Sequence, residues 1–242
     1  MDLNNLPQPL KEGIRIPQDD GRIKLVSPVF RVSYPHLKEK YAGPDGKWKP
    51  SYQVQMIFNA KNPEIPALVD LTKVLIPAMR EALKNAGGTF NAQDSNALDS
   101  FNRVVRLGVG EDKKDEDGGE LPGYEKGTRY IVAKNQEKIA LYDSKRKPLD
   151  PDWFKAGYYA RGGISLATYQ ESGSGLIKVS YYAEELQLLA RGELLGGGSR
   201  EYSDYMGSTD GESFEGEAPK GGEPQEEGPP TDADMWNDGG EY

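Results

Sequence analysis

The stretch 153–189 combines aromatic rings and positive charges at a spacing typical of paired strands. Side chains alternate with period two in each half, and a short polar loop joins the halves. In the first half Tyr159 and Arg161 fall opposite the apolar positions, and in the second Lys178 and Tyr182 do so. A ring beside a cation can stack on a nucleobase and hold its phosphate, because every base has a π-face and every nucleotide a negative charge.

The same residues also have an ordinary interpretation, since tyrosine favours strands and a cation on a strand face is usually solvated. Other strands and loops of the chain repeat the combination of rings and cations. Together they give the predicted nucleic-acid-binding residues: Tyr159, Arg161, Lys178, Tyr182, Arg31, Lys47, Trp48, Lys49, Arg129, Tyr130 and Lys134. An error of one residue in strand register would turn any strand member of this set to the opposite face.

Charge is divided unevenly along the chain. The 242 residues include 30 basic and 39 acidic ones, a net charge of −9. Residues 198–242 hold thirteen acidic and two basic residues, a net −11, which leaves 28 basic and 26 acidic residues, a net +2, in residues 1–197. The acidic pI of 4.9 therefore reflects the tail, and the body is free to bind a polyanion.

The residues needed for several common chemistries are missing. There is no cysteine, and His36 is the one histidine, with no Ser or Asp partner recognisable from spacing. The acidic run 112–118 lacks the anchoring carboxylates of a calcium loop, and neither the dinucleotide nor the Walker glycine motif occurs. We therefore expect no enzyme, no metal and no cofactor, and with no long apolar run or signal peptide we expect a soluble, intracellular protein.

Short strands and frequent turns dominate the body. Residues 52–59 alternate cleanly, which predicts a strand with one wet face. Residues 103–109 predict another strand, and residues 128–134 and 138–142 predict a strand pair. Helical spacing appears from about 63 to 86, with a kink expected at Pro77.

This order predicts a mainly β fold, namely a partly open barrel of the OB type with one inserted α-helix at about 63–86. A β-sandwich is the competing architecture. We expect a flexible arm over residues 1–20, the binding domain over 21–197 and a disordered acidic tail over 198–242, because the tail has too few aliphatic residues to offset its ordering entropy. The tail ends in an aromatic, acidic tip formed by Asp234, Trp236, Asp238, Glu241 and Tyr242.

Several short stretches, in their order along the chain, resemble a family of single-stranded DNA-binding proteins of tailed phages. This family was long catalogued as a domain of unknown function and is now understood as OB-fold proteins. The similar stretches are 29–34, 49–54, 130–134, 157–161 and 194–197, which span most of the body.

The resemblance implies sequence-independent binding of single-stranded DNA in phage replication, recombination and repair, in the cytoplasm of the infected bacterial host. The acidic tail would compete with DNA for the groove and, once displaced, present its tip to a polymerase or helicase. A tail that only prevents aggregation is the simpler alternative. For the whole protein, a protein-binding scaffold, a strand-annealing recombination protein and an unrecognised hydrolase stay open.

Overall fold

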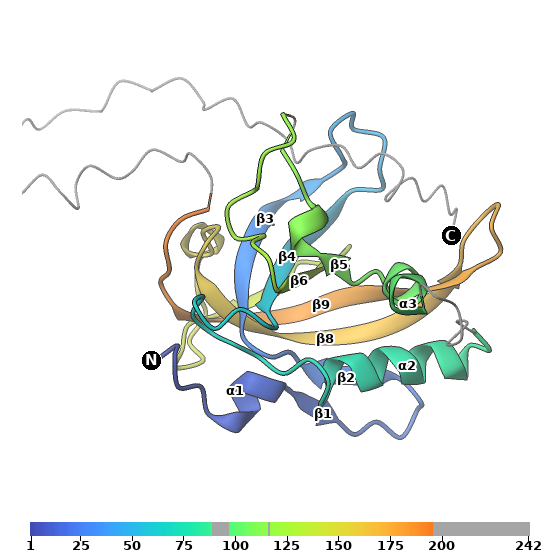
Figure 1. Ribbon diagram of the computed structural model, residues 1–242, viewed down its shortest axis with the longest axis horizontal. Coiled ribbons are helices and arrows are strands. Elements are labelled where there is room, and N and C mark those ends of the chain that lie inside the picture. The colour runs from blue at the N-terminus through green and yellow to red at the C-terminus, as the bar shows by residue number, and fades with distance from the viewer. Residues whose placement is uncertain (89–96, 116, 196–242) are drawn as a thin grey trace, which may run out of the picture.

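Strands account for most of the regular structure. The structure is a computed structural model that describes residues 1–88, 97–115 and 117–195 (Figure 1). Its elements are α1 (Gln8–Glu12), β1 (Ile14–Ile16), β2 (Ile23–Val26), β3 (Phe30–Tyr41), β4 (Ser51–Asn59), α2 (Leu75–Asn85), α3 (Ala97–Val105), β5 (Gly108–Val109), η1 (Gly110–Asp112), β6 (Thr128–Asn135), β7 (Ala140–Tyr142), η2 (Pro151–Trp153), β8 (Tyr159–Gln170) and β9 (Ile177–Ala190).

Five of the strands close into a barrel. β3 pairs with β4, β4 with β6, β6 with β9, β9 with β8, and β8 with β3 again. Two seams are short: β6 and β9 run parallel and pair at two positions, and β3 pairs with β8 at two positions. A partly open, five-stranded barrel is the OB architecture. The predicted fold class is confirmed, and the β-sandwich is excluded.

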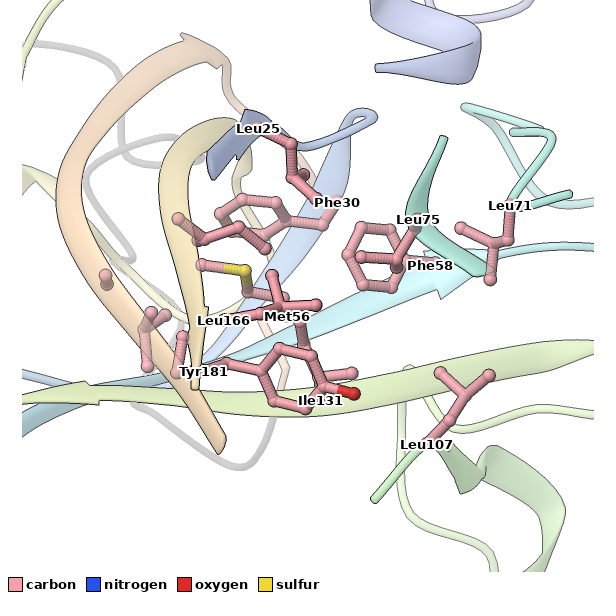
Figure 2. Close-up of a cluster of buried hydrophobic side chains, with 14 of the residues drawn as sticks. Leu25, Phe30, Met56, Phe58, Leu71, Leu75, Leu107, Ile131, Leu166 and Tyr181 are labelled. Carbon is pink, nitrogen blue, oxygen red and sulfur yellow. The ribbon is translucent and has the colours of Figure 1, made fainter. Parts of the chain in front are cut away.

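The hydrophobic core fills the barrel and continues under α2. Met56 and Phe58 point inward from β4, and Phe58 meets Phe30 edge to face with ring centroids 6.0 Å apart (Figure 2). α2 adds Leu75 and Met79, both fully buried. Burying each of these side chains contributes roughly 1.5–3 kcal/mol. Strand 52–59 thus points Val54, Met56 and Phe58 into the core, as its alternation predicts.

The helix predicted over 63–86 is shorter than its apolar spacing suggested. α2 begins at Leu75, so Pro77 lies in the first turn, where a proline needs no hydrogen-bond partner and causes no kink. The preceding residues form turns, which the Asn59 side-chain amide holds by donating to the carbonyls of Asn62 and Ile65 at 2.8 and 2.6 Å. Apolar side chains of this stretch therefore reach the core from a turn.

A helix stands where the sequence predicted the strand 103–109. α3 extends to Val105, and only Gly108–Val109 is a strand. Arg106, with φ 52°, adopts the left-handed conformation that commonly ends a helix. Val104 and Val105 are buried, so the apolar run belongs to the inward face of a helix.

The first twenty residues differ from the expected flexible arm. They contain α1 and β1, and β1 pairs with β2 along three residues. Gly13, with φ 83°, makes the turn between them, and a Cβ there would lie 2.7 Å from the carbonyl oxygen of Val26. The N-terminal segment is part of the folded domain, because ladder hydrogen bonds and close packing hold it.

The predicted strand pair 128–134 and 138–142 is only half right. Both strands form, as β6 and β7, but they do not pair with each other. β7 instead runs parallel to β9, where Ala140 pairs with Glu185. The short turn between β6 and β7 was consistent with a hairpin, but β9 lies between the two strands and pairs with each of them.

Candidate nucleic-acid interface

One row of side chains crosses the outer face of the barrel. The strand registers place Gln53 of β4 beside Lys134 of β6, and Lys134 beside Tyr182 of β9. Residues directly opposite each other on neighbouring strands share a face. The row continues to His36 of β3 at one end and Ser165 of β8 at the other. Tyr182 is 38% exposed, so the row offers an open ring beside an ammonium group.

This row lies where a barrel of this type commonly binds oligonucleotides. β4 and β6 are its second and third strands, and their outer face, with the loop between the first two strands and the loop between the last two, forms the usual site. Here these loops are residues 42–50, between β3 and β4, and residues 171–176, between β8 and β9. The structure brings the predicted Lys134 and Tyr182 together on this face.

The β3–β4 loop holds its tryptophan in a fixed position. Trp48 packs over Gly43, where a Cβ would lie 2.6 Å from the indole ring. The ring meets Tyr41 edge to face with centroids 6.1 Å apart, and Tyr41 stacks on His36 at 4.2 Å. The sequence analysis included Trp48 but missed the two rings that support it, which lie in β3.

Two lysines flank this tryptophan. Lys47 forms an ion pair with Asp45 at 2.9 Å, with its side chain 80% exposed, and Lys49 is also exposed. An ion pair this exposed contributes little to stability, so a phosphate can replace the carboxylate at small cost. The three predicted residues of the loop therefore keep a ring and two cations close together.

Two predicted stacking residues, Tyr159 and Tyr130, are buried instead. Each is 5% exposed. The Tyr159 ring lies against Gly192, where a Cβ would be 2.6 Å away, and burial raises the pKa of its phenol while nearby Arg31 opposes the shift. Tyr130 lies edge to face with Tyr124, with centroids 5.4 Å apart. The prediction that these rings are open is wrong, because segments distant in sequence cover them.

The cover over Tyr130 comes from the covering segment, residues 110–115 and 117–127, whose Leu121 and Tyr124 pack with Ile57 of β4 and Tyr130 of β6 (Figure 1). The Tyr124 hydroxyl contacts the side chains of Ser33 at 3.0 Å and Gln55 at 2.7 Å, and burial raises its pKa well above the ordinary value. The expected wet face of β4 is therefore dry at this end: Gln55 is 7% and Ile57 2% exposed.

Lys113 anchors this cover through a box of three aromatic rings. Its ammonium lies 4.9 Å from the ring centroids of Tyr34 and Tyr124 and 5.1 Å from that of Tyr130. It also donates to Gln55 Oε1 at 2.8 Å, and the residue is 8% exposed. A cation over aromatic faces is favourable when desolvated. The sequence analysis considered the charged run 112–118 only as a calcium loop, and so it missed the role of Lys113.

Three other predicted cations are engaged within the fold. Arg31 donates to the carbonyls of Gly157 at 3.2 Å and Glu193 at 2.6 Å. Arg161 donates to the Gln187 side chain at 2.8 Å. The Lys178 ammonium is paired with the carboxylate of Glu171 and is largely buried. These groups position backbone and loops.

A further ring and cation lie at the base of the β8–β9 loop. The Arg106 guanidinium is 5.8 Å from the ring centroid of Tyr169 and donates to its hydroxyl at 3.0 Å. Tyr169 is the cross-strand partner of Lys178. The sequence analysis missed Arg106 because it placed the residue inside a strand.

Arg129 does not share a face with the other β6 residues. It neighbours Tyr130 in sequence, and successive strand residues point to opposite faces. The structure places it beside Lys61 and Lys126, around a hollow at the start of β6. It lies away from the row formed by Lys134 and Tyr182.

The remaining predictions concern absences and the tail. In the part of the chain that the structure describes, no three acidic or histidine side chains are grouped so as to hold a metal ion. No helix in that part is long and apolar enough to cross a membrane. The predicted tail tip, from Asp234 to Tyr242, lies outside the described residues.

Comparisons with known proteins agree with this architecture. A family model described as "Enterobacter phage Enc34, ssDNA-binding protein" matches residues 23–215. The solved single-stranded DNA-binding protein from bacteriophage Enc34 in complex with ssDNA is similar, with a TM-score of 0.53 and 18% identity, over 77% of this chain and 99% of that chain. A C-terminal truncation of the Enc34 protein gives a TM-score of 0.51 and 16% identity, over 75% and 97%.

A solved structure of gp2.5, a single-stranded DNA-binding protein encoded by bacteriophage T7, has a TM-score of 0.44 and 15% identity, over 80% of this chain and 99% of that chain. No curated protein sequence matches significantly. The structural likeness to the Enc34 protein shows the fold, and the family model covers well over half of the chain. The chain therefore belongs to the family of the Enterobacter phage Enc34 single-stranded DNA-binding protein.

Proposed function

We propose that the protein binds single-stranded DNA without sequence preference and protects it during phage DNA replication, recombination and repair, in the cytoplasm of the infected bacterial host. The observation that carries the proposal is the open ring of Tyr182 beside Lys134, on the strand face that such barrels use for oligonucleotides. The family of the chain supports it. Catalysis has no part in this proposal.

Bases stack on Tyr182 and Trp48, and the lysines around them hold phosphates. Each stacked base contributes about 1–3 kcal/mol and requires no particular sequence, because every base presents a π-face. The body carries a net charge of only +2, so stacking supplies a large share of the affinity. The engaged cations Arg31, Arg161 and Lys178 contribute to the positive field more than to direct contacts.

A titration of the intrinsic fluorescence with single-stranded, double-stranded and RNA oligomers tests the proposal. We expect saturable binding to single strands of any sequence, with log K falling by about 0.7 per phosphate contact for each tenfold rise in salt. A protein-binding scaffold would give no salt-dependent binding. A strand-annealing protein would join complementary oligomers into rings or filaments under the electron microscope.

The acidic tail competes with DNA for this interface and, when displaced, offers its tip to a polymerase or helicase. The position of residue 195 supports this proposal. The Arg31 guanidinium holds the carbonyl of Glu193, and Leu195 packs against the Ile57, Tyr124 and Tyr130 cluster on the outer face of the barrel. Leu195, three residues before the segment of charge −11, thus lies on the outer face of the barrel, the face that also carries Lys134 and Tyr182, and a tethered acidic segment is attracted to cations near its anchor.

Deleting residues 199–242 tests the competition. We expect tighter DNA binding for the truncated chain, with the difference shrinking at high salt because the competing attraction is electrostatic. Equal affinities at low salt would show that the tail does not compete. Replacing Trp236 and Tyr242 by alanine in the full chain tests the tip separately: DNA affinity should stay the same, while capture of a phage polymerase or helicase should be lost.

A further inference from the structure

A hollow of about 440 Å³ opens at the start of β6, away from the row formed by Lys134 and Tyr182. Three cations line it: Lys61 from the β4–α2 connection, Lys126 from the end of the covering segment, and Arg129 from β6. Glu64 and Glu111 also contribute to the wall, so the charged lining has a net charge of +1. The hollow is therefore suited to an anion that can reach the cations from solvent.

Backbone contacts fix the two loops that carry the lysines. Lys61 N–H donates to the carbonyl of Gly127 at 3.1 Å, and the Asn62 side chain donates to the carbonyl of Lys126 at 3.2 Å. Gly127 has φ 91°, and a Cβ there would lie 3.1 Å from the Asn62 nitrogen. The two lysines are thus held on facing sides of one hollow by a tight junction that requires a glycine.

The three cations are not held in ion pairs by the two glutamates that share the hollow with them. Among the residues that the structure describes, Lys61, Lys126 and Arg129 form no ion pair, whereas Lys24 and Lys47 each pair with a carboxylate. Arg129 uses one guanidinium nitrogen to donate to the carbonyl of Thr128 at 2.9 Å, which leaves donors to spare. Three cations that form no ion pair, in a lining of net charge +1, attract a group with several acceptor oxygens, as a phosphate has.

We propose that this hollow is a second phosphate-binding site, which holds the backbone of the same DNA strand after it leaves the Lys134–Tyr182 row. The inference rests on the proposed DNA-binding function. Lys134 and Arg129 are five residues apart on β6, a distance of about 17 Å along a strand. Tyr130, which lies between them on β6, is covered by Tyr124 and Lys113 of the covering segment, so the DNA strand would pass around that segment.

The test compares oligomers of about 4 nucleotides, which fill only the Lys134–Tyr182 row, with oligomers of about 16, the range of site sizes for one barrel. The variant is Lys61→Glu/Lys126→Glu, and the matched control is Lys138→Glu/Lys145→Glu, which changes the charge equally at exposed turns on either side of β7. One lost phosphate contact is worth about fivefold near 0.1 M salt, from a slope of about 0.7 per decade.

We expect the variant to bind the long oligomer about 25-fold more weakly, with a salt slope shallower by about 1.4, and to bind the short oligomer as the unaltered protein does. The control should keep both affinities to within about threefold, the loss that a change of net charge alone would bring. Equal losses for both oligomers, equal losses in variant and control, or no loss in the variant would each overturn the second site. Failure of the unaltered protein to bind either oligomer would instead refute the proposed function.

Binding of inorganic tripolyphosphate distinguishes a site for the DNA backbone from a site for a free polyphosphate. If tripolyphosphate bound the unaltered protein and not the variant, while both bound the long oligomer equally, the hollow would hold a free polyphosphate and the proposal would be wrong. Thermal melting should show that the variant and the control are folded. Lys61→Gln/Lys126→Gln removes the charges without reversing them, and it should also weaken binding of the long oligomer.

Discussion

Tyr182→Ala should weaken DNA binding and leave the fold intact. The ring is 38% exposed and points away from the core, which its neighbour Tyr181 enters. Loss of one stacked base costs about 1–3 kcal/mol, which corresponds to about a 5- to 150-fold weaker affinity for a short oligothymidine. The melting temperature should change little, because exposed substitutions usually stay within about 0.5 kcal/mol.

The assay is fluorescence anisotropy of a labelled oligomer, at a fixed salt concentration, with Tyr182→Phe as the matched control. Phenylalanine keeps the ring and removes the hydroxyl, so its affinity should stay within about twofold if stacking is the interaction. Unchanged affinity of Tyr182→Ala would refute the choice of this face. Equal losses in both variants would show that the hydroxyl, and not the ring, contacts the DNA.

Three further predictions concern stability and pH. Tyr181→Ala should destabilise the fold by about 3–5 kcal/mol in a denaturant melt, because the ring is fully buried. Lys113→Met should cost about 1–3 kcal/mol and raise amide exchange in the covering segment, because the Gln55 side chain loses one of its two donors and three rings lose their cation; unchanged exchange would contradict the anchoring role. Hydrogen bonds from Lys178 and Ser174 lower the pKa of Glu171, so its contribution to stability should be present above the ordinary glutamate pKa of about 4.3 and lost as the pH falls through the lowered value; a melting series should show this dependence, and Glu171→Gln should lack it.

Local alternation in the sequence was sufficient to place Lys134 of β6 and Tyr182 of β9 on the outward face, although it did not exclude Arg129 from that face. Tyr182 lies between two buried residues and Lys134 follows one, and the strand registers then place the two side chains side by side. The same logic failed for Tyr130, because alternation gives the face of a strand and not what covers that face. The cover comes from Tyr124 and Lys113, whose segment has no period of its own.

Apolar runs that fit both a helix and a strand caused the other errors. Val104, Val105 and Leu107 are buried in the structure, as either element would require. The left-handed conformation of Arg106, which separates α3 from β5, has no signature in the residue type. At Pro77 the sequence predicted a kink inside a longer helix, but the proline lies in the first turn of α2, where it causes no break.

The two neighbouring tyrosines of β9 have complementary positions: Tyr181 fixes the strand from inside the core, and Tyr182 points outward on the proposed binding face. The hydroxyl of Tyr181 donates to the carbonyl of Val105, the last residue of α3. A hydrogen bond therefore links the inner side of the strand that carries Tyr182 to this helix. On the proposed function, a base that stacks on Tyr182 would meet a ring whose strand is already fixed in position, and little ordering entropy would be lost on contact. Preorganisation of this kind would let a surface that makes few contacts bind DNA without reading its sequence.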